Sequence, residues 1–319
     1  MPQPFAVGDN DLMTLNNIFM FLPLTGLYEP SAIQRLADGR FLVVEDEKEH
    51  PFSLVTIGPN GSVSSTPLSP GPLAAGDAFW KLDDLEGVAL DQSGFIYALT
   101  SHSRDGDGVE KKSRDKLVRF RIEENRVVAP VVVNGLKRAL IATHPVLAAA
   151  AEIQDVKTGG GLNIEALEFS LDQQRLLIGF RSPLQGNRAI IASVENPSAI
   201  FEADEPPRIS ATLDLLDLGR NGIRGMSYVP ALGGYLVISG PVASEQVHFE
   251  LWFWSGHPDA PARRVTVPGL PGFERAEGVS PAVIDGEQRI IIVSDDGSRE
   301  EGRFARFLLL APGQLQIAP

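Results

Sequence analysis

Five short segments of this chain each open with a charged residue that precedes an apolar, strand-like run, and in most of them the next residue is small. They read EPSAI, EGVAL, EALEF, RGMSY and EGVSP, and they begin at Glu29, Glu86, Glu165, Arg224 and Glu277. The starts are 57, 79, 59 and 53 residues apart, and self-similarity at such a period is typical of a repeat array or a propeller. Because the first strand of each propeller blade lines the central channel, the pattern predicts four glutamates and one arginine around one axis.

Carboxylates that meet at one axis need a compensating group, because they repel one another unless they are protonated, paired or bound to a cation. Arg224 can pair with one or two of them, and a hard divalent cation such as Ca²⁺, which prefers oxygen ligands, can take the rest. The alternative is a buried charge network that fixes the blade register without a ligand. The predicted ligands of Ca²⁺, or of another divalent cation, are Glu29, Glu86, Glu165 and Glu277, with Asp46 or Asp295.

Polar residues also follow the second strand-like run of each repeat. Equivalent strand ends converge on one face of a propeller, so we expect a pocket at the channel mouth. His102 is the candidate general base, and Arg181 or Arg224 would stabilise a developing oxyanion. Ordinary solvated turns are the alternative explanation for part of this set, which comprises residues 45–47, 101–104, 181–182, Ser239 and 294–296.

Each repeat contains several short β-rich runs separated by turns, as expected for consecutive antiparallel strands. We therefore predict an all-β chain that forms a single domain over residues 1–319, a β-propeller of five blades, or of six if a degenerate repeat escapes the count. The last repeat lacks a strand, and the N-terminal run LNNIFMFLPL is predicted to close the ring near the termini. The alanine- and leucine-rich stretch around residues 134–158 predicts one helical insertion, which would either pack as plain structure or cover the channel mouth.

Composition narrows the classes of partner. The 319 residues carry a net charge of −13, and the basic residues are scattered, which opposes a nucleic-acid-binding role. Cysteine is absent, and neither an export signal nor a run of about 18 apolar residues is found, so we expect a cytoplasmic protein that does not bind a membrane. The motifs of zinc proteases, elbow-type serine esterases, P-loop enzymes and Rossmann enzymes are also missing.

A series of phrases runs in order from about Leu27 to Ser298, namely YEPSAI, VVEDE, DDLEGVAL, TSHSR, NIEALEF, IGFRSPL, GIRGMSY, VISGP, AEGVS and VSDDG. On these phrases the chain resembles the bacterial propeller proteins grouped as domain of unknown function 3616. That family is more distantly similar to the esterase-like phytase propellers, a likeness that implies channel carboxylates holding Ca²⁺ and the hydrolysis of phosphomonoesters. This chain departs from the phytase pattern because it has no comparable lysine-rich phosphate site and carries Arg224 among its glutamates.

Two functions of different classes remain open. The first is a divalent-metal-dependent hydrolase, of the calcium type, that acts on a phosphoester or a lactone bound at the channel mouth. The second is a non-catalytic binding or scaffold propeller with a protein partner and a structural charge network in its channel. Polar residues concentrated at one face favour a small-molecule ligand, whereas exposed apolar patches on the blade edges would favour the scaffold.

Overall fold

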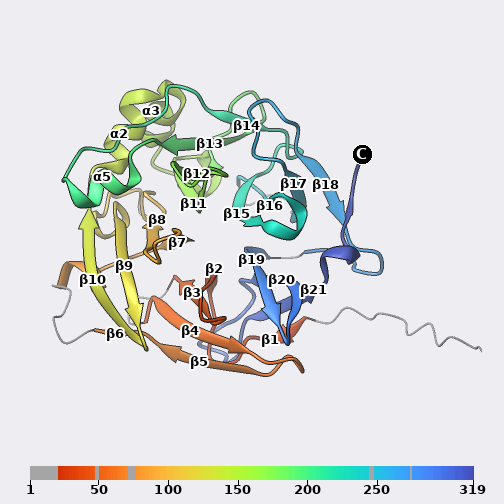
Figure 1. Cartoon of the computed structure of the whole chain (residues 1–319). Coiled ribbons are helices and arrows are strands. Elements are labelled where there is room, and N and C mark those ends of the chain that lie inside the picture. Colours follow the sequence, from red (N-terminus) through yellow and green to blue (C-terminus); the bar gives the residue numbers. More distant parts are fainter. Residues whose placement is uncertain (1–20, 47–49, 71–76, 244–247, 274) are drawn as a thin grey trace, which may run out of the picture.

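The computed structural model describes residues 21–46, 50–70, 77–243, 248–273 and 275–319. Its strands form five sheets arranged in a ring around one axis (Figure 1). The all-β, five-bladed propeller predicted from the repeat spacing is therefore confirmed, and the six-bladed alternative is wrong. No helix of the described residues is long and apolar enough to cross a membrane.

Four or five strands build each blade, and the first strand of each lies nearest the axis (Figure 1). Blade 1 contains β2 (Pro30–Arg35), β3 (Phe41–Glu45), β4 (Phe52–Ile57) and β5 (Val63–Pro67). Blade 2 contains β7 (Leu85–Leu90), β8 (Ile96–Thr100), β9 (Leu117–Glu123) and β10 (Arg126–Val133), with β6 (Ser69–Pro70) parallel to β10 at its edge. Blade 3 contains β11 (Asn163–Phe169), β12 (Leu176–Ser182), β13 (Ala189–Val194) and β14 (Asp214–Leu216).

The two termini complete the last two blades. Blade 4 contains β15 (Gly222–Val229), β16 (Gly234–Gly240), β17 (Glu250–Trp254) and β18 (Arg263–Thr266), and β22 (Gln316–Ile317) pairs with β18 at the outer edge. Blade 5 contains β19 (Ala276–Ile284), β20 (Glu287–Ser294) and β21 (Arg306–Leu310). Its fourth strand is β1 (Leu22–Pro23), which pairs antiparallel with β21. Closure by an N-terminal strand is thus confirmed for these two residues, while most of the predicted run lies outside the described residues.

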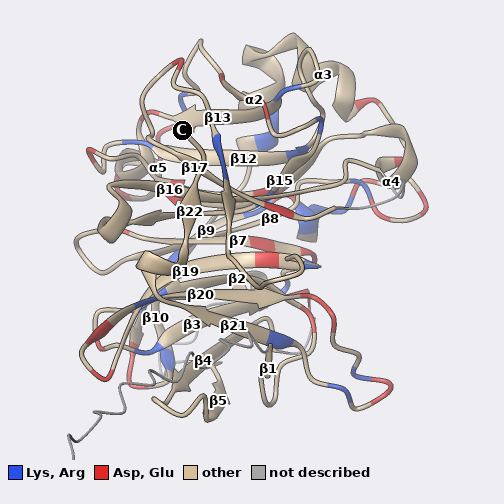
Figure 2. Cartoon of the chain, turned by 90° about the vertical axis from the view of Figure 1, so that its right-hand side faces the viewer, with Lys and Arg blue, Asp and Glu red and all other residues tan. Residues whose placement is uncertain are grey.

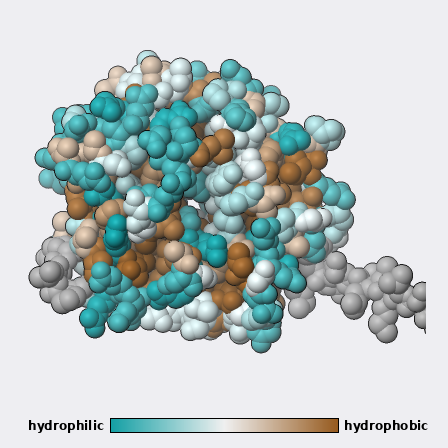
Figure 3. Space-filling model, viewed as in Figure 1, coloured by the Kyte–Doolittle hydropathy of each residue, from teal (hydrophilic) through white to brown (hydrophobic). Residues whose placement is uncertain are grey.

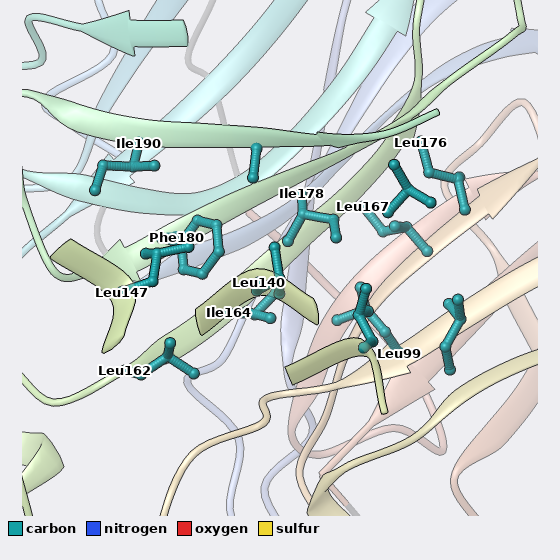
Figure 4. Packing of buried hydrophobic residues seen from close by; sticks show 14 of the residues in the cluster. Leu99, Leu140, Leu147, Leu162, Ile164, Leu167, Leu176, Ile178, Phe180 and Ile190 are labelled. Atoms are coloured by element: carbon teal, nitrogen blue, oxygen red, sulfur yellow. The ribbon is translucent and has the colours of Figure 1, made fainter. Parts of the chain in front are cut away.

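Helices are short and lie between strands. They are α1 (Asp77–Trp80), α2 (Leu136–Thr143), α3 (Pro145–Ala151), α4 (Val156–Gly159) and α5 (Pro197–Glu202). The predicted insertion corresponds to α2, α3 and α4, and Pro145 starts α3, where its missing N–H costs nothing. Leu140 and Leu147 of this insertion pack with Ile164 and Phe180 of blade 3 (Figure 4).

The hydrophobic core is divided among the contacts between neighbouring blades. Five clusters of buried residues lie between blades 1 and 2, 2 and 3, 3 and 4, 4 and 5, and 5 and 1. Because each blade packs against a neighbouring blade on both of its faces, strands such as β3 and β13 are buried along their whole length. Hydrophilic residues predominate on the face of the ring in Figure 3, and hydrophobic residues show between them only in patches.

Candidate functional site

One residue of each innermost strand is left out of the ladder with the second strand. The register shifts on either side of Ser31, Glu86, Glu165, Arg224 and Glu277. Such a β-bulge turns a side chain away from its regular alternation. All five residues line one cavity at the axis, so the bulge explains how an otherwise apolar strand presents a charged group there.

The bulge corrects the predicted alignment of the first repeat. Ala32 pairs with Val44 as Gly87 pairs with Leu99, which makes Ser31 the equivalent of Glu86. Glu29 lies two residues earlier and corresponds to Asp84, a residue that sequence reasoning missed. The ladder of backbone hydrogen bonds sets this register, and matching glutamate to glutamate along the chain does not reveal it. The ring on the axis therefore holds three glutamates, one arginine and one serine.

The small residue after each bulge lets the innermost strands approach closely. A Cβ on Gly225 would lie 2.0 Å from the carbonyl oxygen of Glu277, and one on Gly278 would lie 3.0 Å from the nitrogen of Ile33. Below the ring of charged residues, the space lined by Gly87, Gly225 and Gly278 holds only about 10 Å³. The channel is therefore closed at this level, and the cavity above it is a cup.

The cup has a volume of about 660 Å³. The five bulge residues form its floor, and the loop 103–108 forms part of its wall. Gln154, Asp155 and Val156, at the start of α4, complete its rim. The insertion thus packs α2 and α3 against blade 3 and gives only its last residues to the cup. Charged positions occur along the inner strands as well as in the surface loops (Figure 2). Eight of the nine predicted site residues line the cup, namely Glu29, Asp46, Glu86, Glu165, Arg181, Arg224, Glu277 and Asp295.

Arg224 binds two of the ring glutamates. Its Nε lies 2.8 Å from Glu277 Oε2 and 2.9 Å from Glu165 Oε2, and its Nη2 also contacts Glu277 Oε1. Glu165 Oε1 accepts hydrogen bonds from Asn163 Nδ2 at 2.9 Å and from Arg181 Nη1 at 3.2 Å. All of these side chains are largely buried, so the guanidinium neutralises carboxylates that water cannot solvate.

Glu86 has no such partner. Within the described residues, its carboxylate forms neither an ion pair nor a hydrogen bond, although Glu86 belongs to the same ring. Burial, reinforced by the charges of Glu165, Asp84 and Glu277, raises its pKa well above the ordinary value. Burial also raises the pKa of Glu277 to about 7, against the opposing charge of Arg224.

The upper wall carries two more acids with raised pKa values. Burial, together with the charges of Asp84 and Asp83, raises the pKa of Asp46 to about 6. Burial and the charge of Glu29 raise the pKa of Asp295. These two residues follow β3 and β20, as predicted from the strand ends, and both line the cup.

His102 does not line the cup. It is 1% exposed and has a left-handed backbone with φ of 57°. Its Nδ1 lies 2.7 Å from the carbonyl oxygen of Thr100 and its Nε2 lies 3.4 Å from Asp115 Oδ1. Burial lowers its pKa. His102 is thus buried outside the lining of the cup, and its role as a general base stays a prediction.

The serines of the strand ends also differ from expectation. Ser182, Ser239 and Ser294 are buried and do not line the cup; Ser239 Oγ, for example, accepts a hydrogen bond from Trp252 Nε1 at 3.0 Å. Ser103 does line it and donates to Asp84 Oδ2 at 3.1 Å.

Arg114 is a further cup residue that sequence reasoning missed. Its Nη1 lies 2.9 Å from Asp84 Oδ2, and its Nε donates to Asp83 Oδ2 at 2.9 Å. Asp84 could have been found from its match with Glu29 once the register was known. Arg114 could not, because it comes from a polar loop with no counterpart in the other repeats.

The fit of the cup to a metal ion can be judged from these contacts. Two of the four predicted glutamate ligands are engaged by Arg224. Among the residues that the structure describes, no three His, Asp or Glu side chains lie close enough together to hold a metal ion. Binding of Ca²⁺ therefore stays a prediction.

No family model matches the chain, and no curated protein matches it. Membership of the domain of unknown function 3616 family therefore stays an expectation. Solved structures of β-propeller enzymes are similar to the chain. A putative oxidoreductase, a glucose dehydrogenase of Thermus thermophilus, is 16% identical with a TM-score of 0.46, over 92% of this chain and 100% of that one.

Two further structures show the same level of likeness. The PQQ-bound aldose sugar dehydrogenase of Streptomyces coelicolor is 15% identical with a TM-score of 0.43, over 93% of this chain and 96% of that one. A gluconolactonase of Xanthomonas campestris is 12% identical with a TM-score of 0.39, over 93% of this chain and 86% of that one. Likenesses this distant carry no argument about the chemistry of the cup.

Proposed function

We propose that this propeller is a hydrolase of a small polar ester, with a lactone as the better candidate, and that the cup is its active site. The observation that carries the proposal is the contrast between Glu86 and the other two ring glutamates. Arg224 holds Glu165 and Glu277, whereas Glu86 lines the cup, forms no ion pair or hydrogen bond among the described residues, and has a raised pKa. A carboxylate with a raised pKa suits general acid–base chemistry near neutral pH.

In this proposal Glu86 takes a proton from the water molecule that attacks the ester carbonyl carbon. The carbonyl π electrons move to oxygen, and Arg181 stabilises that oxyanion with a guanidinium whose side chain is 22% exposed at the cup. When the carbonyl re-forms, the bond between the acyl carbon and the alcohol oxygen breaks. The proton held by Glu86 passes to the departing alkoxide, so the reaction needs no other acid.

A phosphoester substrate would require a different electrostatic arrangement. Ten carboxylates and four arginines line the cup, and such a surface repels an anionic phosphate unless a cation intervenes. Ca²⁺ or another divalent cation would then have to be held by Glu29, Asp46, Glu86 and Asp295, with Glu165 and Glu277 remaining on Arg224. Metal-dependent phosphoester hydrolysis is therefore the second form of the proposal.

The test measures turnover of γ-lactones and δ-lactones and of 4-nitrophenyl phosphate, with EDTA and with added Ca²⁺. We expect lactone hydrolysis in EDTA, and a decrease in kcat of about 100-fold or more in Glu86→Gln, the scale of a lost general base. Glu287→Gln serves as the matched control, because Glu287 is the exposed first residue of β20 and does not line the cup. Phosphate hydrolysis that appears only with Ca²⁺ would support the second form, and no turnover of either class would reject the enzyme.

A non-catalytic role has one observation in its favour, the ion-paired network of Arg224, Glu165 and Glu277, which also suits a purely structural ring. A protein partner has less support. The large hydrophobic residues that are exposed in the described part of the chain, Val109, Val131, Ile153, Leu171 and Val283, come from separate loops and strands rather than from one continuous run. Binding of a small molecule in the cup without turnover would favour this role.

A further inference from the structure

The cup contains cationic groups, but all of them are already paired. Arg224 and Arg181 contact Glu165, Arg114 contacts Asp84, and Arg104 lies 3.6 Å from Glu110. An anionic group of a ligand would therefore have to compete with these carboxylates for an arginine.

Several carboxylates of the lining, in contrast, form no ion pair. Within the described ranges, the side chains of Glu29, Glu86 and Asp295 form no ion pair or hydrogen bond, and Asp46 accepts only the backbone N–H of Asp84, at 3.2 Å. They come from blades 1, 2 and 5 and the segments just before or after their strands. The unmatched charge of the cup is thus negative and is spread over more than one blade.

A neutral side chain gives an independent indication of the same kind. Asn163 is 7% exposed, lines the cup, and donates through Nδ2 to Glu165 Oε1 at 2.9 Å. That bond fixes the orientation of the amide, because only the NH₂ group can donate to a carboxylate. Its Oδ1 then has no hydrogen-bond donor among the described residues. A buried acceptor without a donor is costly, so a ligand whose donor reached Oδ1, an atom with almost no exposed surface, would gain from that bond.

The spacing of these acceptors separates two kinds of cation. A bare metal ion needs several oxygens within about 2.6 Å of one point, and no three of the described acidic or histidine side chains meet that condition. An organic ammonium group instead donates separate N–H bonds, and a molecule with one or two such groups can reach carboxylates on different blades. A cup of about 660 Å³ has room for such a molecule.

We infer that the ligand of the cup is an organic cation with at least one protonated amino group, bound by Glu29 and Asp295. Since this inference rests on the proposed hydrolase, the substrate class becomes an amino-substituted ester or lactone. The ammonium group binds Glu29 and Asp295, and the ester occupies the space beside Arg181 and Glu86, so that Glu86 is left to take the proton from the attacking water.

The binding test compares three four-carbon probes that differ only in their end groups. 1,4-Diaminobutane, 1,4-butanediol and succinate are titrated into the whole chain by calorimetry, in EDTA, at low and at moderate salt. We expect the diamine to bind at least 10-fold more tightly than the diol, the affinity to fall with salt, and succinate not to bind. Glu29→Gln and Asp295→Asn should each weaken binding of the diamine by about 10-fold, while the control Glu287→Gln should not. Equal affinities for diamine and diol, or Ca²⁺ binding without diamine binding, would overturn the inference.

The activity test separates the failure of this inference from the failure of the proposed function. Hydrolysis of α-amino-γ-butyrolactone is compared with that of γ-butyrolactone below the pKa of the amine. A preference of at least 10-fold in kcat/KM for the amino-lactone supports both the hydrolase and the bound organic cation. Diamine binding without hydrolysis of either lactone would keep the cation and reject the hydrolase, whereas equal hydrolysis of the two lactones would keep the hydrolase and reject the cation.

Discussion

Arg224 is the residue on which the charge balance of the ring depends. It is 11% exposed in its side chain and contacts both Glu165 and Glu277. Arg224→Leu would leave these buried carboxylates without a cation, and breaking a buried pair typically costs about 3–5 kcal/mol. Urea unfolding at neutral pH measures this loss. Arg208→Leu is the control, because the Arg208 side chain is 61% exposed and its one ion pair within the described residues is with Glu205 on the surface, so the change in stability should stay within about 0.5 kcal/mol.

The loss of stability caused by Arg224→Leu should also depend on pH. Carboxylates with raised pKa values take up protons in mild acid, which removes their mutual repulsion. The loss caused by Arg224→Leu should therefore be smaller at pH 5 than at pH 8. Equal, small losses at both pH values would show that the guanidinium does not neutralise Glu165 and Glu277 in solution.

At the scale of the elements, the bulge and the glycine after it decide how closely β15 and β19 approach. A Cβ on Gly225 would meet the carbonyl oxygen of Glu277 at 2.0 Å, a backbone atom that cannot move alone. Gly225→Ala should therefore separate the strands below the ring and destabilise the protein by roughly 1–3 kcal/mol, the usual cost of overpacking.

The control for that substitution is Gly313→Ala. No atom lies within 4 Å of a Cβ at Gly313, and the φ of Gly313 is not positive. The stability of the Gly313→Ala variant should therefore be unchanged or slightly raised. Denaturant midpoints of the two variants give the comparison. If Gly225→Ala is tolerated as well as Gly313→Ala, the inner strands are less closely packed than the structure shows.

For the whole molecule, the buried acids predict the direction in which stability changes with pH. Burial raises the pKa of Glu168, between blades 3 and 4, to about 7, and that of Glu277 to about 7. The folded chain then binds more protons than the unfolded chain between these values and 4.5, so its free energy of unfolding falls as pH rises through about 7. A shift of this size corresponds to roughly 3 kcal/mol per group at most.

Urea unfolding at pH 5.5, 7.0 and 8.5 measures this dependence. Stability should decrease over the series, and Glu168→Gln should flatten the slope, because its amide does not titrate. Glu168 does not line the cup. It lies at the contact between blades 3 and 4, where Ser227 Oγ and the Tyr228 N–H donate to its carboxylate. Stability that rises over this range would contradict the prediction.

The sequence by itself determined the fold and the charged character of the axis. Each repeat is a local pattern of turns and apolar runs, and a blade is built from consecutive strands, so spacing along the chain is enough to predict five blades. The same periodicity indicated Glu86, Glu165, Arg224 and Glu277, since equivalent positions of a symmetrical ring must meet.

Only the tertiary structure decided which groups are paired and which are free. The strand register places Ser31 and not Glu29 on the ring, and His102 is buried outside the lining of the cup. Arg114 lines the cup and comes from a loop that no other repeat contains. Pairing depends on distances between residues of different blades, and those distances arise from packing around the whole ring. That is why the sequence predicts Glu86 as a member of the ring, but not as the glutamate that forms no ion pair among the described residues.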